Sequence, residues 1–151
     1  DVFGSWRAMQ ELYTEGKIRA IGVANFHPDR VMDLIINSGF TPAINQIETH
    51  PFDQQISTQE FLQNNNVQIQ SWGPFAEGKN DIFQNEVLKA IAQKYNKSTA
   101  QVILRWLIQR GVAAIPKSVR KERMAENFNI FDFELSNKNF GIEKSFPDFF
   151  H

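Results

Sequence analysis

Four short β-type runs separated by helical patterns constrain the fold of this chain more than any other feature. The runs begin near residues 18, 43, 67 and 112, and every interval between them contains at least one amphipathic helical pattern. Parallel strands need a long crossover connection, usually a helix, whereas antiparallel strands can be joined by a short turn. The alternation therefore predicts an α/β fold in which βα units form a parallel sheet.

Residues at the ends of the helical patterns indicate where the helices begin and end. The first helix is expected to begin at Ser5 as its N-cap and to end at Gly16, and the second to lie between Pro28 and Gly39. Further helix starts are predicted at a capping box of Ser57 and Glu60, at residue 86, at a cap of Ser98 with Gln101, and beyond Ser118.

The composition fits one globular domain. A chain of 151 residues with 42% hydrophobic and 13% aromatic residues can bury an ordinary core. Its net charge of −1 gives no attraction to nucleic acid or to a membrane surface, so we expect neither partner. No apolar run approaches the roughly 20 residues of a membrane span, and the N-terminus does not resemble a signal peptide. We therefore expect a cytoplasmic protein.

Several classes of site are disfavoured by the residues that the chain lacks. The sequence contains no cysteine and three histidines, which excludes disulfides and thiol catalysis and leads us to expect no metal site. No Gly-x-Gly-x-x-Gly motif is present, so a Rossmann-type phosphate loop is unsupported.

A basic segment follows the last β-type run. Lys117, Arg120, Lys121 and Arg123 surround the expected start of a helix. A helix N-terminus carries partial positive charge and free N–H groups, so cations are unfavourable there unless an anion neutralises them. With the Ser118 hydroxyl, the segment predicts an anion site, most simply for phosphate. The alternative is a solvated basic turn.

Other polar and aromatic candidates also come directly after β-type runs. They are Asn25, Glu48 with His50, and Trp72, and the Lys117 segment occupies the same position after the last run. In parallel α/β folds the C-terminal ends of the strands form the edge at which ligands bind. We therefore expect these residues to share one edge of the sheet.

The chemistry of these candidates allows more than one interpretation. The Asn25 and Gln46 amides could bind a carboxamide through paired donors and acceptors, or could be structural. Trp72, next to Gly73, could stack on a flat ring or pack in the core. Glu48 and His50 could form a general acid/base pair, or His50 could bond a backbone group.

Five segments together resemble the aldo-keto reductase family. They are residues 22–26 (Gly-Val-Ala-Asn-Phe), 45–48 (Asn-Gln-Ile-Glu), 71–75 (Ser-Trp-Gly-Pro-Phe), 115–119 (Ile-Pro-Lys-Ser-Val) and 127–136 (Asn-Phe-Asn-Ile-Phe-Asp-Phe-Glu-Leu-Ser). They are most similar to the bacterial branch of diketogluconate and prostaglandin-F-synthase-like reductases. The resemblance implies the C-terminal half, the last four βα units, of a (β/α)8 TIM barrel that uses NADPH and has no Rossmann domain.

The resemblance also implies roles for particular residues. Asn25 and Gln46 would hold the nicotinamide carboxamide, and Trp72 would stack on the nicotinamide ring. The 2′-phosphate and the adenine of NADPH or NADP would be bound by a second group of residues, namely Lys117, Ser118, Arg120, Arg123, Glu126 and Asn127.

Three departures from the family pattern limit what the resemblance implies. The family's catalytic Asp, Tyr, Lys and His would precede Asp1, so we expect no catalytic residue in this chain and expect it to be a piece of a longer protein. Ala24 stands where family members often have Ser. Residues 137–151 do not match the family's usual helix and substrate loop, so residues 1–136 form the expected partial barrel and 137–151 a divergent, mobile tail.

Three functions remain open. The first is the cofactor-binding half of an NADPH-dependent reductase whose intact parent acts on a small carbonyl substrate. A half-barrel would expose strand edges and apolar side chains, so we expect it to pair with the missing N-terminal half or with itself. The second is a protein that binds NADP(H) as a sensor without catalysis. The third is a small, open, doubly wound domain that binds another phosphorylated ligand.

Overall fold

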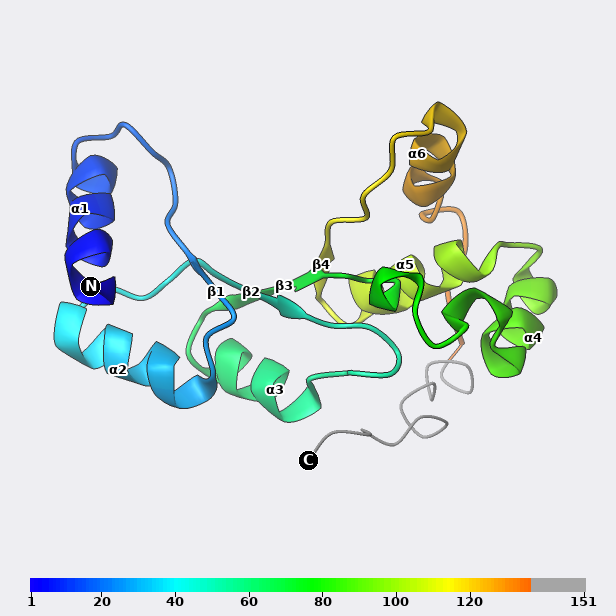
Figure 1. Cartoon of the computed structure of the whole chain (residues 1–151), viewed down its shortest axis with the longest axis horizontal. Helices are drawn as coiled ribbons and strands as arrows, with labels where there is room; N and C mark the ends of the chain where they lie inside the picture. The colour runs from blue at the N-terminus through cyan, green and yellow to red at the C-terminus, as the bar shows by residue number, and fades with distance from the viewer. Residues whose placement is uncertain (137–151) are drawn as a thin grey trace. The chain divides into compact units, whose positions relative to one another are not determined.

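The computed structural model describes residues 1–136, and the expected tail at 137–151 lies outside the described residues. The described part of the chain forms two compact units (Figure 1). The first unit contains residues 1–47 and 55–70, and the second contains residues 48–54 and the chain from residue 71 onward. In both units helices alternate with strands, as the sequence predicts.

The strands belong to a four-stranded sheet in the order β1-β2-β3-β4. Strand β1 pairs with β2 in parallel, with Val23 opposite Asn45 and Ala24 opposite Gln46. The strands span Val23–Ala24 (β1), Ile44–Glu48 (β2), Gln68–Trp72 (β3) and Ala113–Ala114 (β4).

The inner and outer strands differ in how well the sequence predicted them. The runs at 43–48 and 67–72 are confirmed as β2 and β3, whereas the expected strands at 18–23 and 112–115 are too long. Strands β1 and β4 have only two residues each and stand at the two ends of the strand order. A terminal strand has a partner on one side only, so fewer of its residues form ladder hydrogen bonds.

The first unit contains the helices α1 (Val2–Thr14), α2 (Pro28–Ser38) and α3 (Ile56–Asn64). A core cluster forms around the buried side chains of Trp6, Ile21 and Leu34. The Trp6 indole donates a hydrogen bond from Nε1 to the Ser38 hydroxyl at 3.2 Å, so its polar atom is satisfied as its ring is buried. This bond joins α1 to the end of α2.

Two predicted helix starts are wrong. Helix α1 begins at Val2 with Asp1 as its N-cap, and the Ser5 N–H donates to the Asp1 carbonyl oxygen at 3.1 Å. Helix α3 begins at Ile56 without a side-chain cap, so Ser57 and Glu60 form no capping box. In both cases the hydroxyl residue lies inside the helix, because the helix begins before it.

Gly22 is required by a close approach of two chain segments. A Cβ atom at this position would lie 2.7 Å from the Ile44 carbonyl oxygen, closer than non-bonded atoms can approach. The absence of a side chain therefore lets the segment leading into β1 run beside β2. This places Asn25 directly beyond the end of β1.

The second unit contains α4 (Glu86–Tyr95), α5 (Thr99–Gln109) and α6 (Lys121–Phe128), preceded by the 3-10 turns η1 (Ala76–Gly78) and η2 (Ile82–Gln84). Helix α5 is largely buried. Its capping box is confirmed: Ser98 Oγ accepts from the Gln101 N–H at 3.2 Å, and the Ser98 N–H donates to Gln101 Oε1 at 3.0 Å. No helix within residues 1–136 has the length and apolar character needed to cross a membrane.

Candidate functional site

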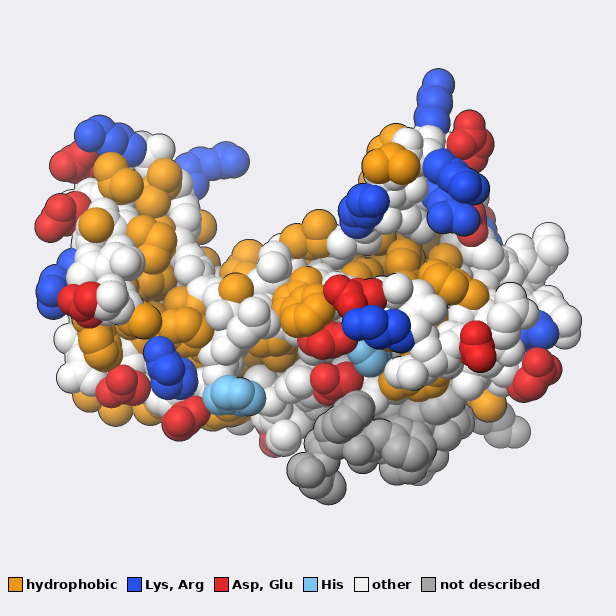
Figure 2. All heavy atoms as spheres, viewed as in Figure 1, with side chains coloured by type: hydrophobic (Ala, Val, Ile, Leu, Met, Phe, Trp, Pro, Cys, Tyr) orange, Lys and Arg blue, Asp and Glu red, His pale blue; other side chains and the backbone are white. Residues whose placement is uncertain are grey.

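The basic segment predicted from the sequence surrounds the start of α6. Arg120 is the N-cap and provides no side-chain cap. Its N–H donates instead to the Ser118 hydroxyl at 3.1 Å. Figure 2 shows Lys and Arg side chains gathered over α6 beside apolar ones. The start of the helix therefore combines free N–H groups with excess positive charge.

These cations lack acidic partners. Within residues 1–136, neither Lys117, Arg120, Lys121 nor Arg123 forms an ion pair. By contrast, Lys97, elsewhere in the same unit, bonds both carboxylate oxygens of Asp132 at 2.7 Å. Glu122, an acidic residue in the first turn of α6, offsets part of this charge, and the four cations leave the helix start net positive, so it attracts anions.

A pocket of about 350 Å³ adjoins this basic helix start. Five of the predicted site residues line it: Lys117, Ser118, Arg123, Glu126 and Asn127. The remaining lining residues are Phe75, Phe83, Ser98, Thr99 and Ala100. Arg120 lies outside this lining, at the N-cap position of α6. The structure thus brings together most of the residues expected to bind a phosphorylated adenosine.

Gln101 holds two walls of this pocket together. Its side-chain amide donates to the carbonyl oxygens of Glu126 at 3.2 Å and Asn129 at 2.9 Å. Gln101 is also the third residue of α5 and part of its capping box. The start of α5, which contributes Thr99 and Ala100 to the lining, is therefore fastened to the end of α6.

The chemistry of the pocket suits a phosphorylated ligand. Lys117 and Arg123 supply two cations against the single carboxylate of Glu126, so the lining carries net positive charge. The Ser118 hydroxyl and the N–H groups at the start of α6 add uncharged donors. The Asn127 amide can both donate and accept, as recognition of a base edge requires. These residues therefore fit a group that joins a phosphate to a nucleobase.

Asn25 and Gln46 lie close together in the first unit. The Asn25 N–H donates to the Gln46 carbonyl oxygen at 2.9 Å. Asn25 has a positive φ of 58°, which Asn tolerates better than most residues and which ends the extended β1 segment. The Gln46 amide donates from Nε2 to Gln70 Oε1 at 2.7 Å. Gln46 is therefore positioned by its neighbour on β3.

A buried amide that the sequence did not single out positions the loop after β1. Asn45 is fully buried, and its side chain bonds the backbone of Phe26 twice. Nδ2 donates to the Phe26 carbonyl oxygen at 2.7 Å, and Oδ1 accepts from the Phe26 N–H at 3.3 Å. The residue after Asn25 is thus held to β2. The sequence signal for this role was the position of Asn45 inside the predicted strand run at 43–48.

Trp72 is the last residue of β3 and belongs to the second unit. It is half-buried, whereas its neighbour Ser71 is fully buried and donates from Oγ to the Thr49 carbonyl oxygen at 2.6 Å. Gly73 follows with a φ of 58° and ends the strand. The alternation along β3 therefore places Trp72 on the more open face and Ser71 on the packed face.

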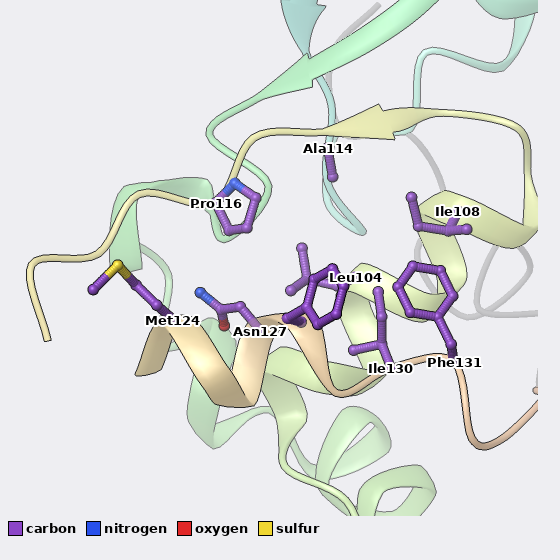
Figure 3. A pocket seen from close by; sticks show the side chains of 9 residues that line it. Leu104, Ile108, Ala114, Pro116, Met124, Asn127, Ile130 and Phe131 are labelled. Carbon is purple, nitrogen blue, oxygen red and sulfur yellow. The ribbon is translucent and has the colours of Figure 1, made fainter. Parts of the chain in front are cut away.

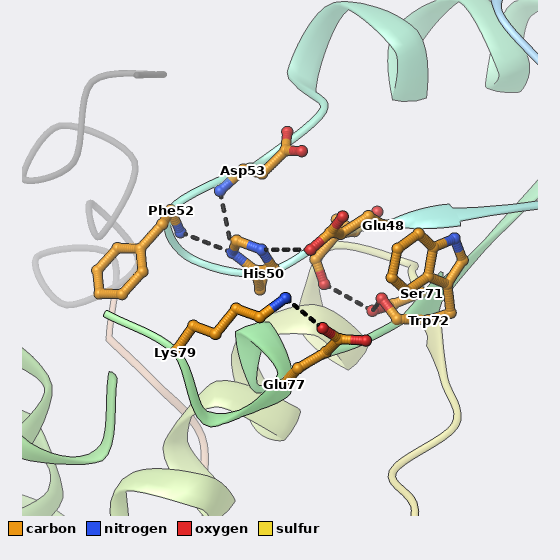
Figure 4. Close-up of polar contacts among 9 residues, drawn as sticks. Glu48, His50, Phe52, Asp53, Ser71, Trp72, Glu77 and Lys79 are labelled. Carbon is orange, nitrogen blue, oxygen red and sulfur yellow. Dashed lines mark hydrogen bonds and ion pairs between the residues drawn. The ribbon is translucent and has the colours of Figure 1, made fainter. Parts of the chain in front are cut away.

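Glu48 and His50 form a structural contact (Figure 4). His50 Nδ1 accepts from the N–H groups of Phe52 at 3.2 Å and Asp53 at 3.1 Å. The imidazole proton is therefore assigned to Nε2, which lies 3.2 Å from Glu48 Oε1. Because both ring nitrogens are engaged and the ring is buried, His50 holds the turn after β2. The structure thus favours the backbone-bonding interpretation over an acid/base pair.

An ion pair beside this turn shifts two pKa values. Lys79 Nζ bonds Glu77 Oε2 at 2.5 Å. The hydrogen bond and charge of Lys79 lower the pKa of the Glu77 carboxyl, and Glu77 raises the pKa of Lys79 in return. Both groups are exposed, so this pair is a surface interaction. Elsewhere too, the His, Asp and Glu side chains of residues 1–136 form no group of three or more able to hold a metal ion.

A second pocket, of about 260 Å³, is mostly apolar (Figure 3). It lies among α5, β4 and the α6 region, and Asn127 is the polar side chain in its lining. Phe128 and Phe131 also line it, and they are 78% and 61% exposed. The described residues of this lining carry no charge, which a phosphorylated cofactor needs, and its exposed rings suit an apolar partner.

Comparisons with known proteins agree with this geometry. A model of the aldo/keto reductase family matches residues 2–146. The chain is 45% identical over 135 residues to the 9,11-endoperoxide prostaglandin H2 reductase of Trypanosoma cruzi, covering 89% of this chain and 48% of that protein. It is also 45% identical over 135 residues to the glyoxal reductase of Bacillus subtilis, with shares of 89% and 48%.

A solved structure is similar in fold as well. The aldo-keto reductase of Bombyx mori in complex with NADP superposes with a TM-score of 0.88 at 35% identity, over 95% of this chain and 50% of that chain. The chain thus spans about half the length of the relatives it matches. The predicted fold, four βα units that make half of a (β/α)8 barrel, is confirmed. A family model that matches nearly the whole chain and relatives at 45% identity show that this chain belongs to the aldo/keto reductase family.

Proposed function

We propose that this chain is the cofactor-binding half of an NADPH-dependent reductase that converts aldehydes or ketones to alcohols. The observation that carries the proposal is the cluster of cations at the start of α6. These cations form no ion pair within residues 1–136, and they adjoin a pocket lined by Lys117, Arg123, Glu126 and Asn127. A 2′-phosphate distinguishes NADPH from NADH, and the cluster offers it charge-assisted hydrogen bonds. The family membership directs the choice among phosphorylated ligands towards NADPH.

The residues of the chain divide the binding of this cofactor between them. Lys117, Ser118, Arg120 and Arg123 hold the 2′-phosphate, and Glu126 and Asn127 contact the adenine. This set gathers at one helix start and its pocket, with Arg120 contributing from the N-cap.

The nicotinamide end is held by residues at the ends of the strands. Asn25 and Gln46 bind the carboxamide, and Trp72 stacks on the ring. The bond from the Asn25 N–H to the Gln46 carbonyl oxygen keeps the two amide residues adjacent. When bound, NADPH supplies the hydride that reduces the carbonyl carbon. This chain orients the cofactor, and the proton donor is expected in a segment that precedes Asp1.

A partner surface follows from the same proposal. The apolar pocket beside α6, with exposed Phe128 and Phe131, supports docking of an N-terminal half-barrel, or otherwise of a second copy of this chain. Burial of two phenylalanine side chains contributes roughly 1.5–3 kcal/mol each to such an association. The carbonyl substrate would be bound in the assembled protein.

The test is to join this chain to a complementary N-terminal half-barrel from a reductase of the family. The joined protein should oxidise NADPH in the presence of an aldehyde such as glyoxal, measured by the loss of absorbance at 340 nm. Its matched control carries Lys117→Glu and Arg123→Glu and should turn over slowly at the same NADPH concentration. A folded assembly without turnover contradicts the proposal.

A second candidate is binding of NADP(H) without catalysis, as in a sensor. It is favoured by the structural use of His50, which leaves the Glu48–His50 pair without an acid/base role in this chain. Locating a Tyr and Lys pair in the segment that precedes Asp1 would argue against this candidate. Tight binding of NADPH by an assembly that lacks turnover would support it.

A further inference from the structure

The pocket beside α6 has an aromatic lining that none of the roles above uses. Phe75 and Phe83 both line it, and their ring centroids are 5.5 Å apart at an interplanar angle of 51°. Phe83 is 40% exposed, although a phenylalanine side chain is usually buried. An aromatic ring that is exposed at a pocket and contacts a second ring is suited to bind a flat ligand.

The backbone of Phe83 is anchored on both sides. Ile82, which precedes it, is fully buried, and the Thr99 hydroxyl donates to the Phe83 carbonyl oxygen at 3.5 Å. Two residues further on, Asn85 caps α4 by accepting from the N–H groups of Val87 at 3.0 Å and Leu88 at 3.2 Å. The partly exposed Phe83 ring is thus presented by a fixed segment, as a preorganised binding residue requires.

We infer that Phe83, supported by Phe75, stacks on the purine ring of the bound nucleotide and makes the pocket selective for adenosine phosphates over sugar phosphates. The inference rests on the proposed function, because it assigns the adenine of the same cofactor to this lining. Glu126 and Asn127, in the same lining, supply acceptor and donor groups for the edge of the base, while Lys117 supplies charge for the phosphate. A sugar phosphate satisfies the cations and leaves the aromatic rings unused.

The size of the pocket agrees with this ligand. Its volume of about 350 Å³ is at the lower end of ligand pockets, which run from roughly 300 to 1,000 Å³. That volume suits the phosphorylated adenosine part of a dinucleotide. Because the whole lining belongs to the second unit, the 151-residue chain can be tested with this part of the cofactor alone.

The experiment measures the dissociation constants of adenosine 2′,5′-bisphosphate and ribose 5-phosphate by calorimetry. Phe83→Leu keeps the apolar volume and removes the aromatic face. It should therefore weaken the affinity for the bisphosphate by about tenfold, within the range of base–aromatic stacking. The affinity for ribose 5-phosphate should not change. Phe83→Trp should restore the affinity, and Tyr13→Leu, which changes an exposed ring of the first unit outside this lining, should leave it unchanged.

A second readout reports stacking directly. In the proton NMR spectrum, the adenine H2 and H8 signals should shift upfield when the bisphosphate binds the parent chain, and this shift should shrink with Phe83→Leu. If Phe83→Leu leaves the bisphosphate affinity unchanged, or weakens both ligands equally, the inference is overturned. It is equally overturned if the parent chain binds ribose 5-phosphate as tightly as the bisphosphate.

The inference and the proposed function fail in different ways. A parent chain that binds 5′-AMP as tightly as adenosine 2′,5′-bisphosphate, and that still depends on Phe83, contradicts the 2′-phosphate site and supports the stacking residue. A clear preference for the 2′-phosphate without dependence on Phe83 contradicts the stacking residue alone. A chain that binds neither nucleotide contradicts both.

Discussion

The side chain of Gln101, three residues into α5, donates a hydrogen bond to the carbonyl oxygen of Asn129 beyond the end of α6, at 2.9 Å. The same amide donates to the Glu126 carbonyl oxygen, while its oxygen accepts from the Ser98 N–H. Gln101 is only 7% exposed. One buried side chain therefore caps α5 and holds the helix that carries the basic cluster.

Replacing this residue tests that connection. Gln101→Leu fills similar space and leaves several backbone groups without partners, so the free energy of unfolding should fall by about 1–3 kcal/mol for each buried group left unsatisfied. Urea titration followed by circular dichroism measures the loss. The exposed Gln84 makes a matched control, and Gln84→Leu should change stability by less than about 0.5 kcal/mol. Equal losses in the two variants would refute the bridging role.

Reversing charge in the lining of the pocket should remove its preference for the 2′-phosphate. In the assembled enzyme, Lys117→Glu with Arg123→Glu removes two charged bonds of roughly 1.5–3 kcal/mol each, so NADPH affinity should fall by about 10²- to 10⁴-fold. NADH affinity should change far less, because it has no 2′-phosphate. Fluorescence titration with both cofactors provides the measurement.

The control for this variant is a neighbouring cation that does not line the pocket. Lys121→Glu alters the same helix start by the same charge as Lys117→Glu, yet Lys121 lies outside the lining. Its effect on NADPH affinity should therefore be the smaller of the two single variants. If the double variant retains its preference for NADPH over NADH, the basic segment is a solvated surface turn.

The buried amide of Asn45 should matter for both stability and cofactor binding. Asn45→Leu leaves the part-buried Phe26 N–H and carbonyl without their partners, and each should cost at most the roughly 1–3 kcal/mol of a fully buried group. The loop that carries Asn25 should then exchange its amide protons faster. Asn64→Leu, on the exposed face of α3, is the control. Unchanged exchange at Asn25 in the Asn45 variant would show that the clamp does not position the loop.

Capping signals within a few neighbouring residues predicted a helix start correctly only where the helix begins at the capping residue itself. Ser98 and Gln101 form the expected capping box, because both partners lie within one turn of the helix they begin. Ser5 and Ser57 carried similar signals and failed, because α1 and α3 begin earlier than those hydroxyls. The preference of Ser for the N-cap position is therefore overridden when the preceding segment already starts the helix.

The charged residues of the site could be predicted from the sequence, whereas the residues that act through packing or through long-range contacts could not. Lys117 and Arg123 stood out because cations at a helix start are locally unfavourable, and the structure places both in one pocket. Phe83 could not be recognised, since it lies in a short 3-10 turn without helical or strand periodicity. Gln101 was assigned only its local capping role, because its contact with Asn129 spans 28 residues of sequence.

The ion pair between Lys97 and Asp132 should make stability depend on pH in the acid range. Lys97 Nζ lies 2.7 Å from both carboxylate oxygens of Asp132, and this hydrogen bond lowers the pKa of the Asp132 carboxyl from its ordinary value of 3.8. A lowered pKa means that the folded state favours the ionised form. The resulting stabilisation is present above pH 3.8 and is lost as the pH falls through the lowered pKa.

Asp132→Asn removes this dependence. The variant should be less stable than the parent chain at pH 7. The difference should shrink as the pH falls from 3.8 through the lowered pKa of Asp132, because the folded parent chain then protonates this carboxyl as well. Urea midpoints at pH 7, 4 and 3 follow the difference. Glu134→Gln is the control, since Glu134 is 80% exposed and lies 3.9 Å from Arg105, too far for a hydrogen bond. If the difference in urea midpoint between Asp132→Asn and the parent chain stays constant across these pH values, the amide disturbs packing. The charge of Asp132 then contributes nothing to stability.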